Sequence, residues 1–123
     1  MKCKEIFLER EITINNQKVG QIFIAEYGNQ YHLEFSLDEE HWGKGIMSEE
    51  VKKYLDMVCS LGVNRLLAVV KKDNIASQKI LDKNHFIKVA ETKDKDILLR
   101  DFEFGKAALE KAVKTKGILD LSK

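Results

Sequence analysis

Apolar and polar residues alternate in three runs near the start of the chain, and this period of two predicts three successive β-strands. The runs cover residues 6–14, 19–27 and 31–37. An Asn-Asn pair at 15–16 and a Gly-Asn pair at 28–29 separate them, as expected of tight turns. The apolar side of the first run consists of Ile6, Leu8, Ile12 and Ile14. Together the runs predict an antiparallel meander whose third strand has one apolar and one polar face.

The apolar spacing changes to that of an amphipathic helix from Met47 onward, and Gly62 supplies a stop. The residues on this helical face are Met47, Val51, Tyr54, Leu55, Val58 and Leu61. The continuous apolar run at 66–70 is then typical of a strand buried on both sides. A strand, a crossover helix and a further strand predict a parallel pair with a right-handed connection.

The rest of the chain predicts a second helix, a hairpin and a third helix. Asn74 is a good N-cap for a short helix. Alternating runs at 86–90 and 97–102 predict the hairpin, and residues 106–114 have helical composition. The apolar tail at 118–121 has no predicted place.

These elements predict a mixed α/β (α+β) fold with a mostly antiparallel sheet of about six strands and a short C-terminal helix. Their order is strand-strand-strand-helix-strand-helix-strand-strand, in one domain spanning residues 1–123. The chain is 44% apolar and 33% charged with a formal net charge of +1, so no partnership with nucleic acid or a membrane surface is expected. No apolar run has the length of a membrane span and the N-terminus lacks the apolar core of a signal peptide, so we expect a cytoplasmic protein. Cys3 and Cys59 lack metal-ligand or redox spacing, and we expect free thiols and no metal site.

The candidate chemistry begins at Gly43 and Gly45, which lie directly before the long helix. A glycine-rich turn that feeds a helix N-terminus directs several backbone N–H groups and the positive end of the helix dipole at one point. Such a point suits a phosphate group. A Gly-x-Gly before a helix is also common as a mere strand-to-helix turn, so this motif alone leaves both interpretations open.

Two segments, WGKGIMSEE at 42–50 and DNIASQKILDKNHF at 73–86, together with the order of elements, resemble the GNAT superfamily of acetyl-CoA-dependent N-acetyltransferases. The resemblance is greatest to its ribosomal-protein N-terminal acetyltransferase branch. The family's first motif is Gln/Arg-x-x-Gly-x-Gly/Ala, and its three positions hold Trp42, Gly45 and Met47, so only the central glycine is matched. The second motif matches at Asn74, Ser77 and Phe86, and His85 replaces its glycine. Histidine is among the residues that tolerate positive φ, so the turn can survive this replacement.

The resemblance implies a coenzyme A site around the glycine turn. Backbone N–H groups from residues 43–47 would hold the pyrophosphate, and Lys44 either adds a positive charge or is a solvated surface lysine. The pantetheine arm would lie between strands 35–37 and 66–70, with Asn74 and Ser77 along it, and Asn74 can also be a helix cap. The cofactor-binding residues so implied are Phe35, Leu37, Trp42, Gly43, Lys44, Gly45, Ile46, Met47, Asn74 and Ser77.

The resemblance also implies a base for the acceptor amine and an acid for the leaving thiolate. His32 and Glu34, on the polar face of the third strand, are comparable candidates for the base, although without the resemblance both would be ordinary surface residues. The family's tyrosine acid falls on Leu81, so Ser77, a water molecule or bulk solvent must protonate the thiolate. These assignments make His32, Glu34 and Ser77 the candidate catalytic residues.

The implied function is an acyltransferase that moves the acetyl group of acetyl-CoA directly to a primary amine on a protein N-terminus, a lysine or a small molecule. The family places two helices between its first two strands, and here two asparagines join them, so the chain is short at its N-terminus. Either a second copy in a homodimer or the segment 106–123 would then supply a wall of the acceptor site, or the substrate is a large exposed one such as a protein lysine or N-terminus. The alternative is a truncated GNAT-like binding or regulatory module that binds coenzyme A without efficient catalysis.

Overall fold

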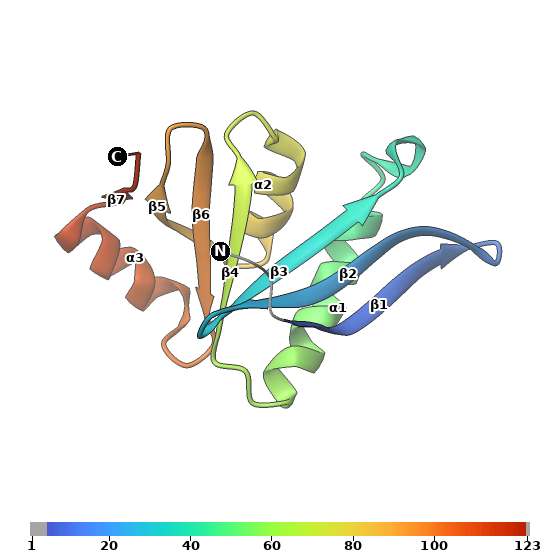
Figure 1. The fold of residues 1–123 in the computed structure, drawn as a ribbon, viewed down its shortest axis with the longest axis horizontal. Coiled ribbons are helices and arrows are strands. Elements are labelled where there is room, and N and C mark those ends of the chain that lie inside the picture. The colour runs from blue at the N-terminus through green and yellow to red at the C-terminus, as the bar shows by residue number, and fades with distance from the viewer. Residues whose placement is uncertain (1–4, 123) are drawn as a thin grey trace.

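The computed structural model describes residues 5–122, in which one seven-stranded sheet carries three α-helices (Figure 1). The strands are β1 (Glu5–Ile14), β2 (Gln17–Tyr27), β3 (Gln30–Leu37), β4 (Arg65–Lys71), β5 (Ile87–Glu91), β6 (Lys95–Asp101) and β7 (Leu119–Asp120). The helices are α1 (Ile46–Ser60), α2 (Ile75–Lys83) and α3 (Gly105–Lys116), with a short 3-10 helix η1 (Glu39–His41) before α1. The strand order is β1-β2-β3-β4-β6-β5-β7. The predicted fold class is confirmed, and the apolar tail without a predicted place supplies β7, which pairs in parallel with β5.

β3 and β4 are the parallel pair predicted around the crossover helix, but they pair over a very short length. The recorded register joins His32 to Leu67, whereas β4 pairs with β6 along its whole length, from Arg65 opposite Asp101 to Lys71 opposite Lys95. Beyond His32 the two strands diverge, and Figure 1 shows their arrowheads far apart. A wedge therefore opens in the middle of the sheet.

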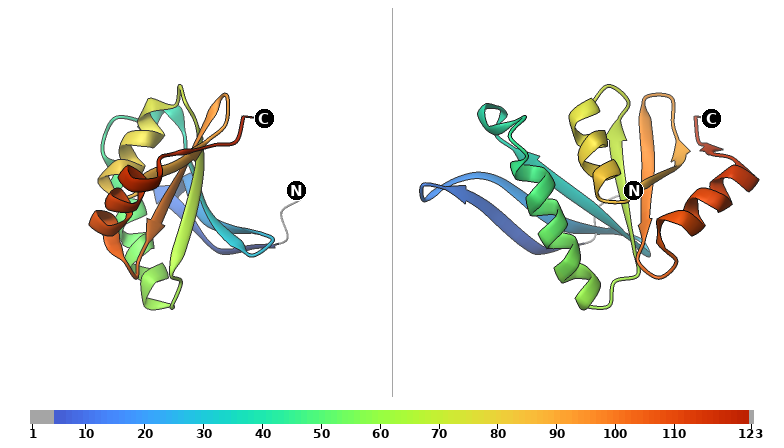
Figure 2. Two further views of the ribbon diagram at one scale, coloured as in Figure 1. Left: turned by 90° about the vertical axis from the view of Figure 1, so that its left-hand side faces the viewer. Right: turned by 180° about the vertical axis from the view of Figure 1, so that it is seen from behind.

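Both crossover helices, α1 and α2, lie on the same face of the sheet (Figure 2, left). The predicted apolar face of α1 is buried except at Leu61, which is 59% exposed because the helix has ended at Ser60. β4 was predicted to be buried on both sides, and this is wrong. Leu66 is fully buried under the helices, whereas Val69 on the opposite face is 42% exposed because no helix covers that side.

A β-bulge interrupts the alternation predicted for β1. The register with β2 shifts between Phe7 and Arg10, and Leu8 adopts a φ of 56°. Phe7 therefore packs against the core beside Leu8, Ile12 and Ile14 of the predicted apolar side. The prediction is wrong at Ile6, which is exposed. The carbonyl of Leu8 accepts a 2.8 Å hydrogen bond from the hydroxyl of Tyr54 on α1, so the bulge is anchored to the core.

The predicted turns adopt the expected backbone conformations. Asn15 and Asn16 have φ values of 52° and 65°, and His85 has a φ of 69° in place of the family's glycine. Cys59 is an exposed free thiol, and Cys3 lies outside the described residues. Within residues 5–122, none of the helices combines the length and the apolar character that a bilayer span requires.

Candidate functional site

The N-terminus of α1 is an uncapped cluster of backbone donors. Gly45, the N-cap residue, has a left-handed φ of 77°, and no side chain caps the helix there. The first intrahelical bond runs from the N–H of Glu49 to the carbonyl of Gly45 at 3.2 Å. The N–H groups of residues 45–48 precede that bond and have no intrahelical acceptor. Among the described residues no other group accepts from them, so they are available to an anion.

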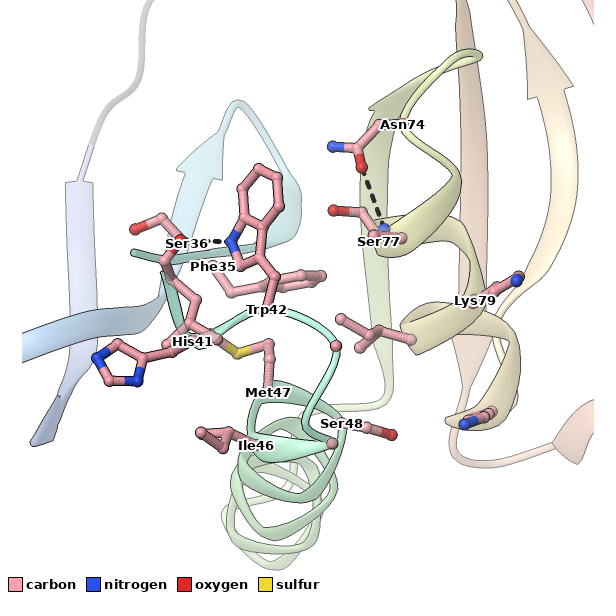
Figure 3. A pocket seen from close by; sticks show the side chains of 16 residues that line it. Phe35, Ser36, His41, Trp42, Ile46, Met47, Ser48, Asn74, Ser77 and Lys79 are labelled. Atoms are coloured by element: carbon pink, nitrogen blue, oxygen red, sulfur yellow. Dashed lines mark hydrogen bonds between the residues drawn. The ribbon is translucent and has the colours of Figure 1, made fainter. Parts of the chain in front are cut away.

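A pocket of about 470 Å³ lies in front of these donors, between the end of β3, the glycine turn and α2 (Figure 3). Its lining consists of Phe35, Ser36, Leu37, His41, Trp42, Gly43, Gly45, Ile46, Met47, Ser48, Asn74, Ala76, Ser77, Lys79, Ile80 and Lys83. The residues predicted to hold the cofactor all line it, except Lys44. Lys44 is exposed in the turn and is not part of the lining.

Trp42 and Asn74 face each other across the pocket (Figure 3). The indole Nε1–H of Trp42 donates a 2.7 Å hydrogen bond to the carbonyl of Leu37 at the end of β3. The Oδ1 of Asn74 accepts from the N–H of Ser77 at 3.1 Å, which confirms Asn74 as the cap of α2. The half-buried Ser77 presents its hydroxyl to the pocket.

Lys79 and Lys83 line the pocket and were not predicted to do so. Both are exposed and lie one turn apart on α2, and Lys79 lies two residues after Ser77. The i, i+4 spacing of the two lysines after the N-cap was the sequence signal that could have found them. They add two positive charges to a pocket that already has the N-terminus of α1.

Two other predicted site residues, His32 and Glu34, lie in a different pocket on the opposite face of the sheet. This pocket has a volume of about 420 Å³ and is lined by Tyr27, His32, Leu33, Glu34, Val69, Lys71 and Lys95. The rings of Tyr27 and His32 make an edge-to-face contact at 4.8 Å, and the hydroxyl of Tyr27 donates to Glu34 at 3.4 Å. Burial lowers the pKa of His32, and the negative charge of Glu34 partly opposes this effect. His32 is therefore neutral near pH 7 and can accept a proton.

The structure thus brings His32 and Glu34 together and leaves Ser77 in the other pocket. The two pockets share no lining residue, but both take residues from β3 at the wedge beside β4. Leu81, at the position of the family's tyrosine acid, is fully buried in the core. A molecule that passes through the wedge would join the two pockets.

Asn84, the C-cap residue of α2, connects this helix to the N-terminal turn of α1. Its side chain, 4% exposed, donates to the carbonyl of Ile80 at 2.9 Å and to that of Ser48 at 3.5 Å. Its own backbone carbonyl accepts from the Nη1 of Arg100 on β6 at 3.2 Å. Ser48 and Ile80 both line the 470 Å³ pocket, so Asn84 fixes the spacing of its two helical walls.

A family model and a curated relative match this chain. The family model described as an acetyltransferase (GNAT) domain matches residues 6–87. The uncharacterized N-acetyltransferase p20 of Bacillus licheniformis is 36% identical over 91 residues, which are 73% of this chain and 47% of that protein. The chain therefore spans about half the length of this curated relative.

Solved acetyltransferase structures share the fold. The ribosomal-protein-S5-alanine acetyltransferase of Vibrio fischeri superposes with a TM-score of 0.65 at 24% identity, covering 71% of this chain and 56% of its own. RimL, a ribosomal L7/L12 α-N-protein acetyltransferase solved in complex with coenzyme A, superposes with a TM-score of 0.71 at 22% identity, covering 77% and 62%. Because the family model matches more than half of this chain, the chain belongs to the GNAT acetyltransferase family.

Proposed function

We propose that this chain is an N-acetyltransferase that transfers the acetyl group of acetyl-CoA directly to a primary amine. The observation that carries the proposal is the pocket at the N-terminus of α1, which combines uncapped backbone donors with the open edge of β3. Family membership supports acetyl transfer, and the neighbour RimL was solved with coenzyme A.

The residues around the pocket fit the parts of coenzyme A. The N–H groups of residues 45–48 suit a pyrophosphate, and Lys79 with Lys83 can add charge beside the phosphates. The backbone of β3 beyond His32 has no β4 partner in the recorded register, so an extended pantetheine arm can add there as a strand would. Phe35 and Leu37 then provide apolar contacts, and Ser77 lies across from them.

The acceptor amine would enter from the opposite face, beside His32 and Glu34. When bound, acetyl-CoA supplies an activated acetyl carbon whose C–S bond is exchanged for a C–N bond. His32 or Glu34 takes the proton from the acceptor ammonium, so that the nitrogen lone pair becomes available for attack. Ser77 or a water molecule returns a proton to the departing sulfur. The two pockets hold the reactants on either side of the wedge, so that the residues act mainly by positioning.

The acceptor is proposed as a protein N-terminus, a lysine or a small amine, and a second copy of the chain is a candidate for completing its site. The alternative is a binding or regulatory module. In it, the site at the N-terminus of α1 binds coenzyme A, but the acetyl group is not transferred efficiently. The leucine at the position of the family's tyrosine acid favours that alternative, whereas the intact glycine turn together with Asn74 and Ser77 favours the enzyme.

A pair of assays tests the proposal. Acetyl-CoA should raise the melting temperature by mass action on the folded state. Thiol release from acetyl-CoA should then depend on added amine, and mass spectrometry should find the acetylated acceptor. A thermal shift without amine-dependent thiol release would support the binding module. Absence of any shift at millimolar acetyl-CoA would contradict both.

A further inference from the structure

Two lysines lie directly opposite each other at one end of the pocket that holds His32 and Glu34. Lys71 is the last residue of β4 and Lys95 the first of β6, and their Cα atoms are register partners. Directly opposed residues of antiparallel strands point to the same face, and both side chains line this pocket. Both lysines are exposed, and like charges in such a pair repel each other.

Neither lysine has a carboxylate partner in the part of the chain that the structure describes. Two acidic residues on the neighbouring strands, Glu91 and Asp96, are already engaged by Lys72 and Lys88. Lys72 lies 3.3 Å and Lys88 lies 3.2 Å from Asp96 Oδ1. The two ammonium groups at the pocket end are thus available to an anion from outside the chain.

The two ends of the pocket therefore favour ligand groups of opposite charge. At one end are Glu34 and His32, which suit an ammonium group or a proton in transit, and at the other are Lys71 and Lys95. From the paired residues His32 and Leu67, Glu34 lies two residues further along β3 and Lys71 lies four residues further along β4. The difference of two residues is about 7 Å along the strand direction, and the divergence of β3 and β4 adds to the separation.

We propose that the acceptor is a peptide amine that carries an acidic side chain two residues along, with Lys71 and Lys95 as its specificity-determining residues. This inference rests on the proposed function, because it names the acceptor of that same site. The amine would lie beside Glu34 and His32, and the carboxylate would relieve the repulsion between the two lysines. A neutral peptide would leave that repulsion in place.

The test compares the C-terminally amidated peptides Ala-Ala-Glu and Ala-Ala-Gln, which have the same length and differ in one charge. Binding is measured by NMR titration of ¹⁵N-labelled protein with coenzyme A present, so the result does not depend on catalysis. At low ionic strength we expect the Glu peptide to bind roughly fivefold tighter, and the advantage to shrink as salt is added. The amides of Lys71 and Lys95 should shift with the Glu peptide.

The double variant Lys71→Gln with Lys95→Gln should reduce the ratio of the two peptide affinities to about one. The control Lys53→Gln, at an exposed position of α1 outside both pockets, should keep the preference. Equal affinity of the two peptides in the unaltered protein, or a preference that survives in the double variant, would overturn the inference. If thiol release fails with every acceptor but the binding preference follows the two lysines, the transfer proposal fails and the assignment of this pocket stands.

Discussion

The Cα atom of His32 lies opposite that of Leu67, at the place where β3 and β4 still pair before they diverge. Each strand is held on its other side. The end of β3 stays with β2, where Leu37 is opposite Gly20, and β4 stays with β6 through Lys71. The Trp42 indole bond to the Leu37 carbonyl, at 2.7 Å, fixes the chain after β3 as well. The wedge is therefore built from strong pairing on both flanks.

Gly20 permits this close approach of β2 to the end of β3. A Cβ built at position 20 would lie 2.4 Å from the backbone carbonyl oxygen of Ser36, and backbone cannot move aside cheaply. We expect Gly20→Ala to lower the free energy of unfolding by about 1–3 kcal/mol, in the range of overpacked cores. Urea denaturation measures this loss. An unchanged midpoint would show that β3 is not held against β2 as described.

Gly45 supplies the left-handed turn that presents the donors of α1, with a φ of 77°. Gly45→Ala should cost about 1 kcal/mol of stability, because a left-handed φ strains a residue with a Cβ. It should also weaken coenzyme A binding, because the added Cβ and the shifted turn disturb the lining of the pocket. Calorimetric titration measures the affinity.

The matched control is Gly62→Ala. Gly62 has a φ of 89° at the other end of α1 and lies outside the pocket lining, and a Cβ at either glycine meets open space. The Gly62→Ala variant should lose a similar amount of stability and should keep the affinity of the unaltered protein for coenzyme A. Equal affinities of the two variants would contradict the role of Gly45.

The free energy of unfolding should depend on pH through His32, and the direction of the pKa shift gives the sign of this dependence. Burial lowers the pKa of His32 below 6.5 in the folded protein, so the unfolded chain binds the proton more readily. The stability that neutral His32 contributes is present above about pH 6.5. It is lost as the pH falls through the lower pKa that His32 has in the folded protein. Urea midpoints at pH 8 and pH 5 should therefore differ less in His32→Gln than in the unaltered protein.

Glu34→Gln provides the control for that assignment, because the charge of Glu34 raises the pKa of His32. In the variant the His32 resonance should titrate at still lower pH by NMR. A titration midpoint that rises in Glu34→Gln would refute the electrostatic account of this pair. If His32 is the base, the rate of acetyl transfer should fall as the pH drops through the same midpoint.

Asn84→Ala should let the two helical walls of the 470 Å³ pocket, α1 and α2, move apart. The change removes the donor to Ile80 and Ser48 from a site that is 4% exposed, and we expect a loss of about 1–3 kcal/mol. Weaker coenzyme A binding should accompany it. The control Asn64→Ala alters an exposed residue whose recorded bond uses its backbone carbonyl, so it should change stability by less than about 0.5 kcal/mol.

The sequence was informative wherever one local pattern determined the structure. The spacing from Met47 to Val58 predicted the buried face of α1, and Asn74 predicted the start of α2. It failed where a distant contact decided the outcome. At the bulge, the carbonyl of Leu8 accepts from the hydroxyl of Tyr54, 46 residues away, and alternation within β1 cannot show that contact. Val69 is exposed because both crossover helices pack on the other face of the sheet, and the sequence of β4 alone does not show this.

For the candidate site as well, local motifs could be predicted from the sequence and features that depend on the tertiary structure could not. The glycine turn and the Asn74 helix were local motifs, and the structure places them on one pocket. The position of Lys44 outside that pocket could not be predicted, because it depends on how the turn is oriented. The pairing of Lys71 with Lys95 could not be predicted either, because it depends on the register of β4 and β6.

Coenzyme A binding at the N-terminus of α1 is tested most directly by ¹⁵N–¹H spectra recorded during a titration with acetyl-CoA. The amides of Gly45, Ile46, Met47 and Ser48 are the proposed donors to the pyrophosphate. We expect them to show large, saturable shifts, with smaller ones at Ser77 across the pocket. If these amides do not move at millimolar acetyl-CoA, coenzyme A does not bind at the N-terminus of α1 as proposed.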